Sequence, residues 1–229
     1  MSDQQNVNDH QVAPSEAGSP VWWLVCKWEL TDLWLGGRAL NFLILFSVLM
    51  SITAYLLATN NELSLTPPKL TVLITLQAAI TFGLFIGLIV AAESISGERE
   101  RATFETLLLT PTSRQQLVLG KFLAALSTWP VAMVIAIPYM ATLSRGDPVL
   151  GPALLWGSVM GSLLAVIFTA LGMVVSIWSN SNRISVFVSL LVYLLCLLPS
   201  QLPGEVQSTR ALTFIRIIDP VEAANQFLQ

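Results

Sequence analysis

The residues with the richest chemistry lie in one stretch, residues 93–121, between two apolar runs. Within it, Glu98, Arg101 and Glu105 are spaced i, i+3 and i+7, which places them on one stripe of an α-helix. Opposite charges at such spacings stabilise a helix by about 0.2–0.5 kcal/mol per pair. An ordered set of charges of this kind is suited to electrostatic docking of a partner protein.

Turn and capping signals follow this charged stripe. Pro111 is expected to end the first helix, because the residue before a proline disfavours the helical conformation. Ser113 is expected to cap a second helix, with Gln116 as its capping-box partner three residues later. The stretch is therefore predicted to form a rigid helix–turn–helix. A solvated loop whose charges merely keep it out of the bilayer is the alternative, and the residues alone leave both open.

Composition limits the functions that the chain can have. Hydrophobic residues make up 54% of the 229 residues and charged residues only 11%, whereas a soluble domain carries about a quarter charged residues. The net charge of −3 does not fit a nucleic-acid-binding protein, which is typically basic. His10 is the only histidine, and the sequence has no zinc-protease or serine-hydrolase motif, so an intramembrane enzyme is disfavoured. Cys26 and Cys196 are predicted to be unpaired packing residues, and no metal site is predicted.

Five apolar runs are long enough, or nearly long enough, to cross a bilayer. A hydrocarbon core of about 30 Å requires about 20 helical residues. The runs are continuous and do not alternate with polar residues, which favours helices over a β-barrel. The sequence therefore predicts an all-α polytopic membrane protein with spans near residues 39–59, 70–92, 122–143, 152–178 and 184–199.

The segments outside these runs indicate how the chain meets the membrane. Residues 1–20 are polar and are expected to form a disordered cytoplasmic tail. Residues 21–38 contain four tryptophans, which favour the membrane interface, so this segment is predicted to be a helix on the membrane surface. Lysine and arginine are concentrated in segments that are cytoplasmic if the N-terminus is inside. The predicted organisation is completed by a transmembrane region at 39–200, in the inner (plasma) membrane, and an extracytoplasmic segment at 201–229.

Several residues within the spans are candidates for close helix packing or for a pathway through the membrane. Small-x3-small pairs occur in two runs, as Gly83 with Gly87 and Gly157 with Gly161. Packing within the chain is favoured for these glycines, and a seam between two copies is the alternative. Gln77 is the most polar residue of the second run, where an interhelical hydrogen bond is favoured over contact with a substrate. Pro130 and Pro138 predict kinks in the third run.

The charged stretch resembles the first cytoplasmic loop of the ABC-2 type transporter permeases, the membrane subunits of ABC exporters. Their pattern is Gly-Glu-Arg-Glu, then Thr, a hydrophobic residue and Glu, then leucines, Ser/Thr-Pro, Ser-Arg and a later Gly-Lys. The matching residues are Gly97, Glu98, Arg99, Glu100, Thr103, Phe104, Glu105, Leu107, Leu108, Thr110, Pro111, Ser113, Arg114, Gly120 and Lys121. Two departures are Ala102, where the family usually has Gly, and the end of the chain about where the sixth span usual in the family is expected.

The resemblance implies that this loop is the element through which a separate ABC ATPase subunit drives the permease. Glu98, Arg101 and Glu105 are the implied charged contacts to that ATPase, and Phe104 and Leu107 are the implied packing contacts. The remaining loop positions of the pattern, through Arg114, are implied to belong to the same contact. The other implied partners are a second permease copy or a similar permease, together with membrane lipids.

The chain has no phosphate-binding loop of its own. A Walker A motif around Gly120-Lys121 would need Gly at position 115 and Ser or Thr at position 122, but Gln115 and Phe122 stand there. No cofactor is therefore expected in this chain, and ATP and Mg²⁺ are expected to bind the partner ATPase.

Two interpretations of different classes stay open. The first is a permease subunit that exports a substrate. The second is a non-transporting membrane anchor or assembly subunit that recruits an ATPase. Substrate-dependent ATPase activity in reconstituted vesicles would separate the two, and the sequence does not indicate which substrate is carried.

Overall fold

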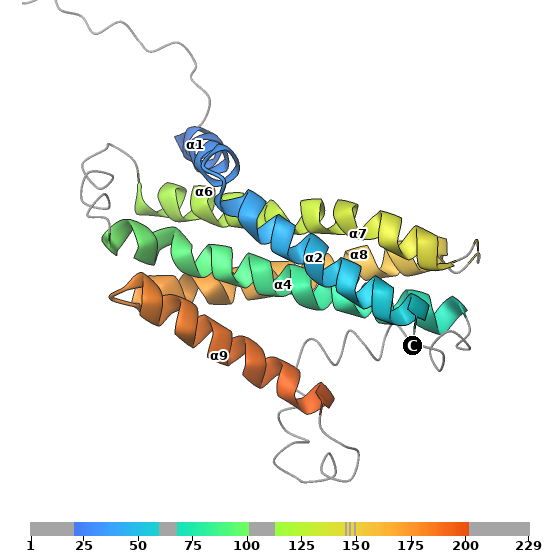
Figure 1. Ribbon diagram of the computed structural model, residues 1–229. Helices are drawn as coiled ribbons and strands as arrows, with labels where there is room; N and C mark the ends of the chain where they lie inside the picture. Colours follow the sequence, from blue (N-terminus) through green and yellow to red (C-terminus); the bar gives the residue numbers. More distant parts are fainter. Residues whose placement is uncertain are drawn as a thin grey trace, which may run out of the picture.

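The computed structural model describes residues 21–59, 68–100, 113–144, 146, 148 and 150–201, and every regular element among them is an α-helix (Figure 1). The helices are α1 (Val21–Leu35), α2 (Arg38–Thr59), α4 (Pro68–Glu100), α6 (Arg114–Leu126), α7 (Thr128–Ser144), α8 (Leu150–Trp178) and α9 (Asn182–Gln201). The predicted all-α class is confirmed for this part of the chain.

Four stretches of the described residues are long and apolar enough to cross a membrane: Arg38–Thr59, Lys69–Glu100, Arg114–Ser144 and Leu150–Trp178. They contain the first four predicted spans. The fifth predicted span, at 184–199, falls in α9, whose apolar stretch Asn182–Leu197 is shorter. A fifth crossing therefore stays a prediction.

Helix α4 runs through the middle of the bundle and contacts α2, α6, α7, α8 and α9 (Figure 1). It can do so because it is apolar nearly all round, which is typical of a helix buried among others. On one side Leu76 and Leu84 belong to a buried cluster with Phe168 of α8. On another side Ala79 belongs to a second buried cluster with Phe46 of α2.

The charged part of the sequence begins inside α4. We expected a span to end near residue 92 and a separate helix to follow, but α4 continues without interruption to Glu100. The two serines in this extension do not break the helix, because their hydroxyls donate to carbonyls of the same helix. Ser94 Oγ donates to the Ala91 carbonyl and Ser96 Oγ to the Ala92 carbonyl, each at 2.7 Å.

The predicted surface helix ends earlier than expected. It was predicted to reach residue 38, but α1 ends at Leu35 and Arg38 already begins α2. Gly37 accounts for the difference, because its φ of 78° lies in the left-handed region that L side chains rarely adopt. The Arg38 guanidinium then pairs with the Asp32 carboxylate across the corner. Figure 1 shows α1 nearly end-on, across the direction of the long helices.

The third predicted span consists of two helices. Ser127 separates α6 from α7, three residues before Pro130. Pro130 has no N–H, so the Leu126 carbonyl lacks its usual helical donor at this point. The kink expected at Pro130 therefore corresponds to a break, whereas Pro138 lies inside α7, which continues past it.

Candidate functional site

One end of the bundle holds the charged residues of the described chain except Lys69, and we call it the charged end. It comprises the last turn of α4, the start of α6, helix α1 and the turn between α8 and α9, all on the left in Figure 1. Gly97, Glu98, Arg99 and Glu100 form the last turn of α4. Ser113 caps α6, and Arg114 is its first residue. The other residues of the predicted contact lie outside the described residues: Arg101, Thr103, Phe104, Glu105, Leu107, Thr110 and Pro111.

The predicted start of the second helix is confirmed. Ser113 has extended backbone, with φ −71° and ψ 143°, and its Oγ accepts a hydrogen bond from Gln116 N at 3.3 Å. This satisfies one of the N–H groups that a helix start leaves without an intrahelical partner. The cap fixes where α6 begins.

A buried ion cluster lies at the centre of the charged end. The Lys121 ammonium of α6 donates to Glu29 Oε1 of α1 at 2.5 Å and also to Glu98 Oε1 of α4. The side chains are 0%, 10% and 17% exposed for Lys121, Glu29 and Glu98. Three helices therefore meet at one cation. Such a cluster is costly to open, because removing one partner leaves a buried charge without compensation.

The residue before this lysine allows the helices to approach. A Cβ on Gly120 would lie 2.7 Å from Val25 Cγ1 and 3.1 Å from the Cys26 backbone N. Only a residue without a side chain permits α1 to cross α6 at this distance. The Gly-Lys pair of the sequence pattern thus has a physical basis: Gly120 admits α1, and Lys121 pairs with the acid that α1 carries.

Sequence reasoning did not find the role of Glu29. A signal was present, because Glu29 follows Cys26 by three residues and precedes Leu33 by four, and these three residues form the buried face of α1. An acidic residue on a buried face requires a cation nearby. Which cation it is depends on how the helices cross, and this cannot be read from α1 alone.

Burial also sets the proton affinities on α1. It raises the pKa of Glu29 above its ordinary value, and the Lys121 ammonium opposes that rise. It raises the pKa of the Cys26 thiol as well, with the Glu29 charge adding to the effect. A thiol with a raised pKa is a poor nucleophile, so Cys26 is a packing residue rather than a reactive one.

A second set of polar contacts joins α4 to the turn between α8 and α9. Ser176 Oγ accepts from the backbone N–H of Ile95 at 3.1 Å and of Ser96 at 2.9 Å. Ser185 Oγ donates to the Ala92 carbonyl at 2.7 Å. Ser176, Ser185 and Ser96 are all fully buried.

The last two residues of α4 extend these contacts. Arg99 Nη1 donates to the Ser179 carbonyl at 2.8 Å, near the end of α8. Glu100 Oε2 accepts from the Asn182 backbone N–H at 3.1 Å, at the start of α9. The arginine thus lies at a helix C-terminus and the carboxylate at a helix N-terminus, which are the ends that the helix dipoles favour for each charge.

The predicted packing residues lie along the middle of the bundle. A Cβ on Gly83 would lie 2.9 Å from the Trp129 ring, and a Cβ on Gly161 would also meet this ring. A Cβ on Gly157 would lie 2.5 Å from Leu76 Cδ1. Gly87 is next to Thr128 and Thr169. All four glycines therefore face other helices of the same chain.

Gln77, the remaining candidate within the spans, is exposed on α4. The structure thus brings the four glycines into close helix contacts but leaves the Gln77 side chain on the surface of this chain.

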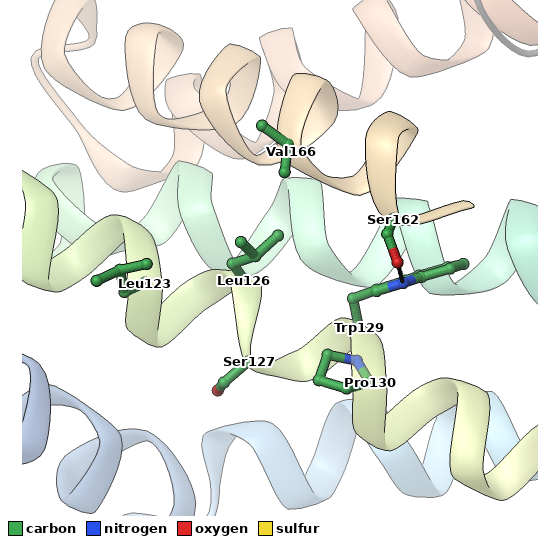
Figure 2. A pocket seen from close by; sticks show the side chains of 7 residues that line it. All are labelled: Leu123, Leu126, Ser127, Trp129, Pro130, Ser162 and Val166. Carbon is green, nitrogen blue, oxygen red and sulfur yellow. Dashed lines mark hydrogen bonds between the residues drawn. The ribbon is translucent and has the colours of Figure 1, made fainter. Parts of the chain in front are cut away.

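A pocket of about 340 Å³ opens beside the break between α6 and α7 (Figure 2). Its walls are mostly apolar: Leu123, Leu126, Ser127, Trp129, Pro130, Ser162 and Val166. The hydroxyls in the wall are already used. Ser162 Oγ accepts from Trp129 Nε1 at 3.0 Å and donates to the Ser158 carbonyl, while Ser127 Oγ accepts from Trp34 Nε1 and donates to the Ala124 carbonyl.

A comparison with protein families identifies a family to which the chain is similar. The family model described as ABC-2 family transporter protein matches residues 23–229. A search of curated proteins found no match. Among the described residues, the family match covers α1 from Trp23 onward and every later helix through α9, and it includes the candidate spans. The chain therefore belongs to the ABC-2 family of transporter proteins, whose members are membrane components of transporters.

Proposed function

We propose that the chain is the membrane-spanning permease subunit of an ABC exporter, driven by ATP that a separate ATPase subunit hydrolyses. The observation that carries this proposal is the family match over residues 23–229. The four candidate spans and the charged end support it. Since the sequence has no Walker A motif, ATP and Mg²⁺ bind the partner chain.

The proposed docking site for the ATPase is the connection between α4 and α6. The charged end faces the cytoplasm of the cell, in the inner (plasma) membrane, and the N-terminus lies on the same side. Arg101 and Glu105 provide charged contacts to the ATPase, and Phe104 and Leu107 pack against it. Two permease copies, or this chain and a similar one, form the pathway, and α9 provides a fifth crossing.

The first experiment is purification of the full chain in mild detergent and identification of the proteins that accompany it. The proposal expects an ABC ATPase, and it expects ATP hydrolysis by the complex in vesicles to rise when the transported substrate is supplied. Glu105→Lys should keep hydrolysis but uncouple it from transport. Lys69→Glu, an exposed change at the opposite end of α4, is the matched control and should leave both unchanged.

Two results would contradict this function. If no ATPase accompanies the chain, the docking proposal fails. If an ATPase binds but its hydrolysis responds to no substrate and no vesicle accumulates one, the chain is instead a membrane anchor or assembly subunit. Normal transport in Glu105→Lys would remove that residue from the docking site.

A further inference from the structure

The last turn of α4 is held from two sides at once. Its Glu98 carboxylate binds Lys121 of α6 within the cluster that also contains Glu29 of α1. The next two residues, Arg99 and Glu100, bind the end of α8 and the start of α9. These three residues are consecutive in sequence, yet their direct partners lie in α6, at the end of α8 and at the start of α9.

Helical geometry explains how consecutive residues reach opposite neighbours. Successive side chains on an α-helix point about 100° apart, since there are 3.6 residues per turn. Glu98 therefore points to α1 and α6, while Arg99 and Glu100 are turned toward α8 and α9. A helix that ended near residue 92, where the predicted span ends, would make none of these contacts.

The contacts at the end of α4 are buried and polar, and they resist movement of α4 relative to its neighbouring helices. The Lys121 side chain is 0% exposed, so its ammonium cannot exchange carboxylates for water without moving a helix. On the other side the fully buried Ser176 hydroxyl accepts from two successive N–H groups of α4. Buried polar networks of this kind specify one arrangement when their members are satisfied.

We infer that Glu98, Arg99 and Glu100 are positioning residues, which join α4 to the α1–α6 corner and to the α8–α9 turn so that both move together with α4. The inference rests on the proposed function for its role, because it assigns these residues to transmission within the permease and not to contact with the ATPase. The Glu-Arg-Glu part of the sequence pattern then anchors the docking element to the transmembrane helices. The ATPase acts on the residues that follow it.

The joining itself can be tested without any ATPase. Spin labels at positions 27 and 183, both exposed, report the distance between α1 and the start of α9 by double electron–electron resonance. The background carries Cys26→Ala and Cys196→Ala, and the protein is held in lipid nanodiscs. The unaltered junction should give one narrow distance distribution.

Two isosteric substitutions then weaken the contacts on one side of α4 each. Glu98→Gln removes the charge that faces Lys121, and Glu100→Gln removes the charge that faces Asn182. Each should broaden the distribution at least twofold, and the two together should broaden it no less than either alone. Gln115→Ala, an exposed change at the start of α6, is the control and should leave the distribution unchanged. Unchanged width in both Gln variants would overturn the inference.

A second measurement uses the complex with its ATPase and does not need the substrate. Addition of a non-hydrolysable ATP analogue with Mg²⁺ should shift the distance between positions 27 and 183. In Glu98→Gln the shift should fall at least twofold while the affinity for the analogue stays the same, which a merely structural defect would not produce. An undiminished shift contradicts the inference. Failure to recover any ATPase contradicts the proposed function instead, and the first measurement still decides the inference.

Discussion

The indole ring of Trp129 occupies the space that a side chain on Gly161 would need. A Cβ at that glycine would lie 2.5 Å from Trp129 Cη2, and a Cβ on Gly83 of α4 would lie 2.9 Å from the same ring. The ring therefore lies between two helices that can hold it only because each has a glycine there. Its Nε1 donates to Oγ of Ser162, the residue after Gly161 in α8, so the ring is fixed at its polar edge as well.

This relationship predicts that Gly161→Ala destabilises the protein. Overpacking a well-filled core costs about 1–3 kcal/mol. Gly151 provides the matched control, because it lies in the same helix and a Cβ there would meet nothing within 4 Å. Gly151→Ala should be neutral or slightly stabilising, since Ala is the better helix former. Thermal unfolding in detergent measures both variants, and equal midpoints would contradict the packing assignment.

Loss of Lys121 should be among the most damaging single changes at the charged end. Lys121→Met leaves Glu29 and Glu98 buried together without a cation, which costs about 3–5 kcal/mol. The control is Lys27→Met on the exposed face of α1, which should change stability by no more than about 0.5 kcal/mol.

A triple variant separates the effect of charge from the effect of packing. Lys121→Met combined with Glu29→Gln and Glu98→Gln removes all three charges and should regain most of the lost stability, because a neutral buried set has no charge left uncompensated. If the triple variant is as unstable as Lys121→Met, the ion cluster is not the cause of the loss.

Glu29 should make stability depend on pH in a defined direction. Burial raises the pKa of Glu29 in the folded chain above the ordinary value of 4.5. At a pH between 4.5 and this raised pKa, the folded chain holds a proton that the unfolded chain releases. The contribution of Glu29 is therefore present at low pH and falls as pH rises through this window. Unfolding midpoints of the wild type and Glu29→Gln, measured at a series of pH values, give this contribution as their difference. A difference that grows with rising pH would mean that pairing with Lys121 outweighs burial.

Cys26 should resist thiol reagents. Its side chain is buried and its pKa is raised, so both access and the thiolate fraction are low. Maleimide labelling near neutral pH, followed by mass spectrometry, should modify Cys26 far more slowly than a cysteine placed at the exposed neighbouring position by Lys27→Cys. Equal labelling rates would show that α1 separates from α6 in solution.

Local features of the fold were predictable from the sequence. Long apolar runs indicated the spans, and the Ser113 cap followed from a hydroxyl three residues before Gln116. These features depend on neighbours in sequence. The class of the protein and the family resemblance of the charged stretch could also be predicted, because both depend on residues that are close in sequence.

Features that depend on how helices cross were not predictable. The Lys121–Glu29 pair joins residues 92 positions apart, and nothing in either segment alone selects the other. The predicted span ended near residue 92, where polar and charged residues begin, whereas α4 continues to Glu100 and the Ser94 and Ser96 hydroxyls bind the helix that carries them. The docking role assigned to residues 101–112 stays a prediction.

The junction at Ser127 has a consequence for how its span can bend. At this point the Ser127 and Thr128 hydroxyls donate to the Ala124 and Ala125 carbonyls, at 2.6 and 2.8 Å. A discontinuous helix in hydrocarbon ordinarily needs water or a neighbouring chain to cover its exposed peptide groups. Here two hydroxyls of the span itself bind carbonyls beside the break, so a bend at this point leaves fewer peptide groups to be satisfied by water or by a neighbouring chain.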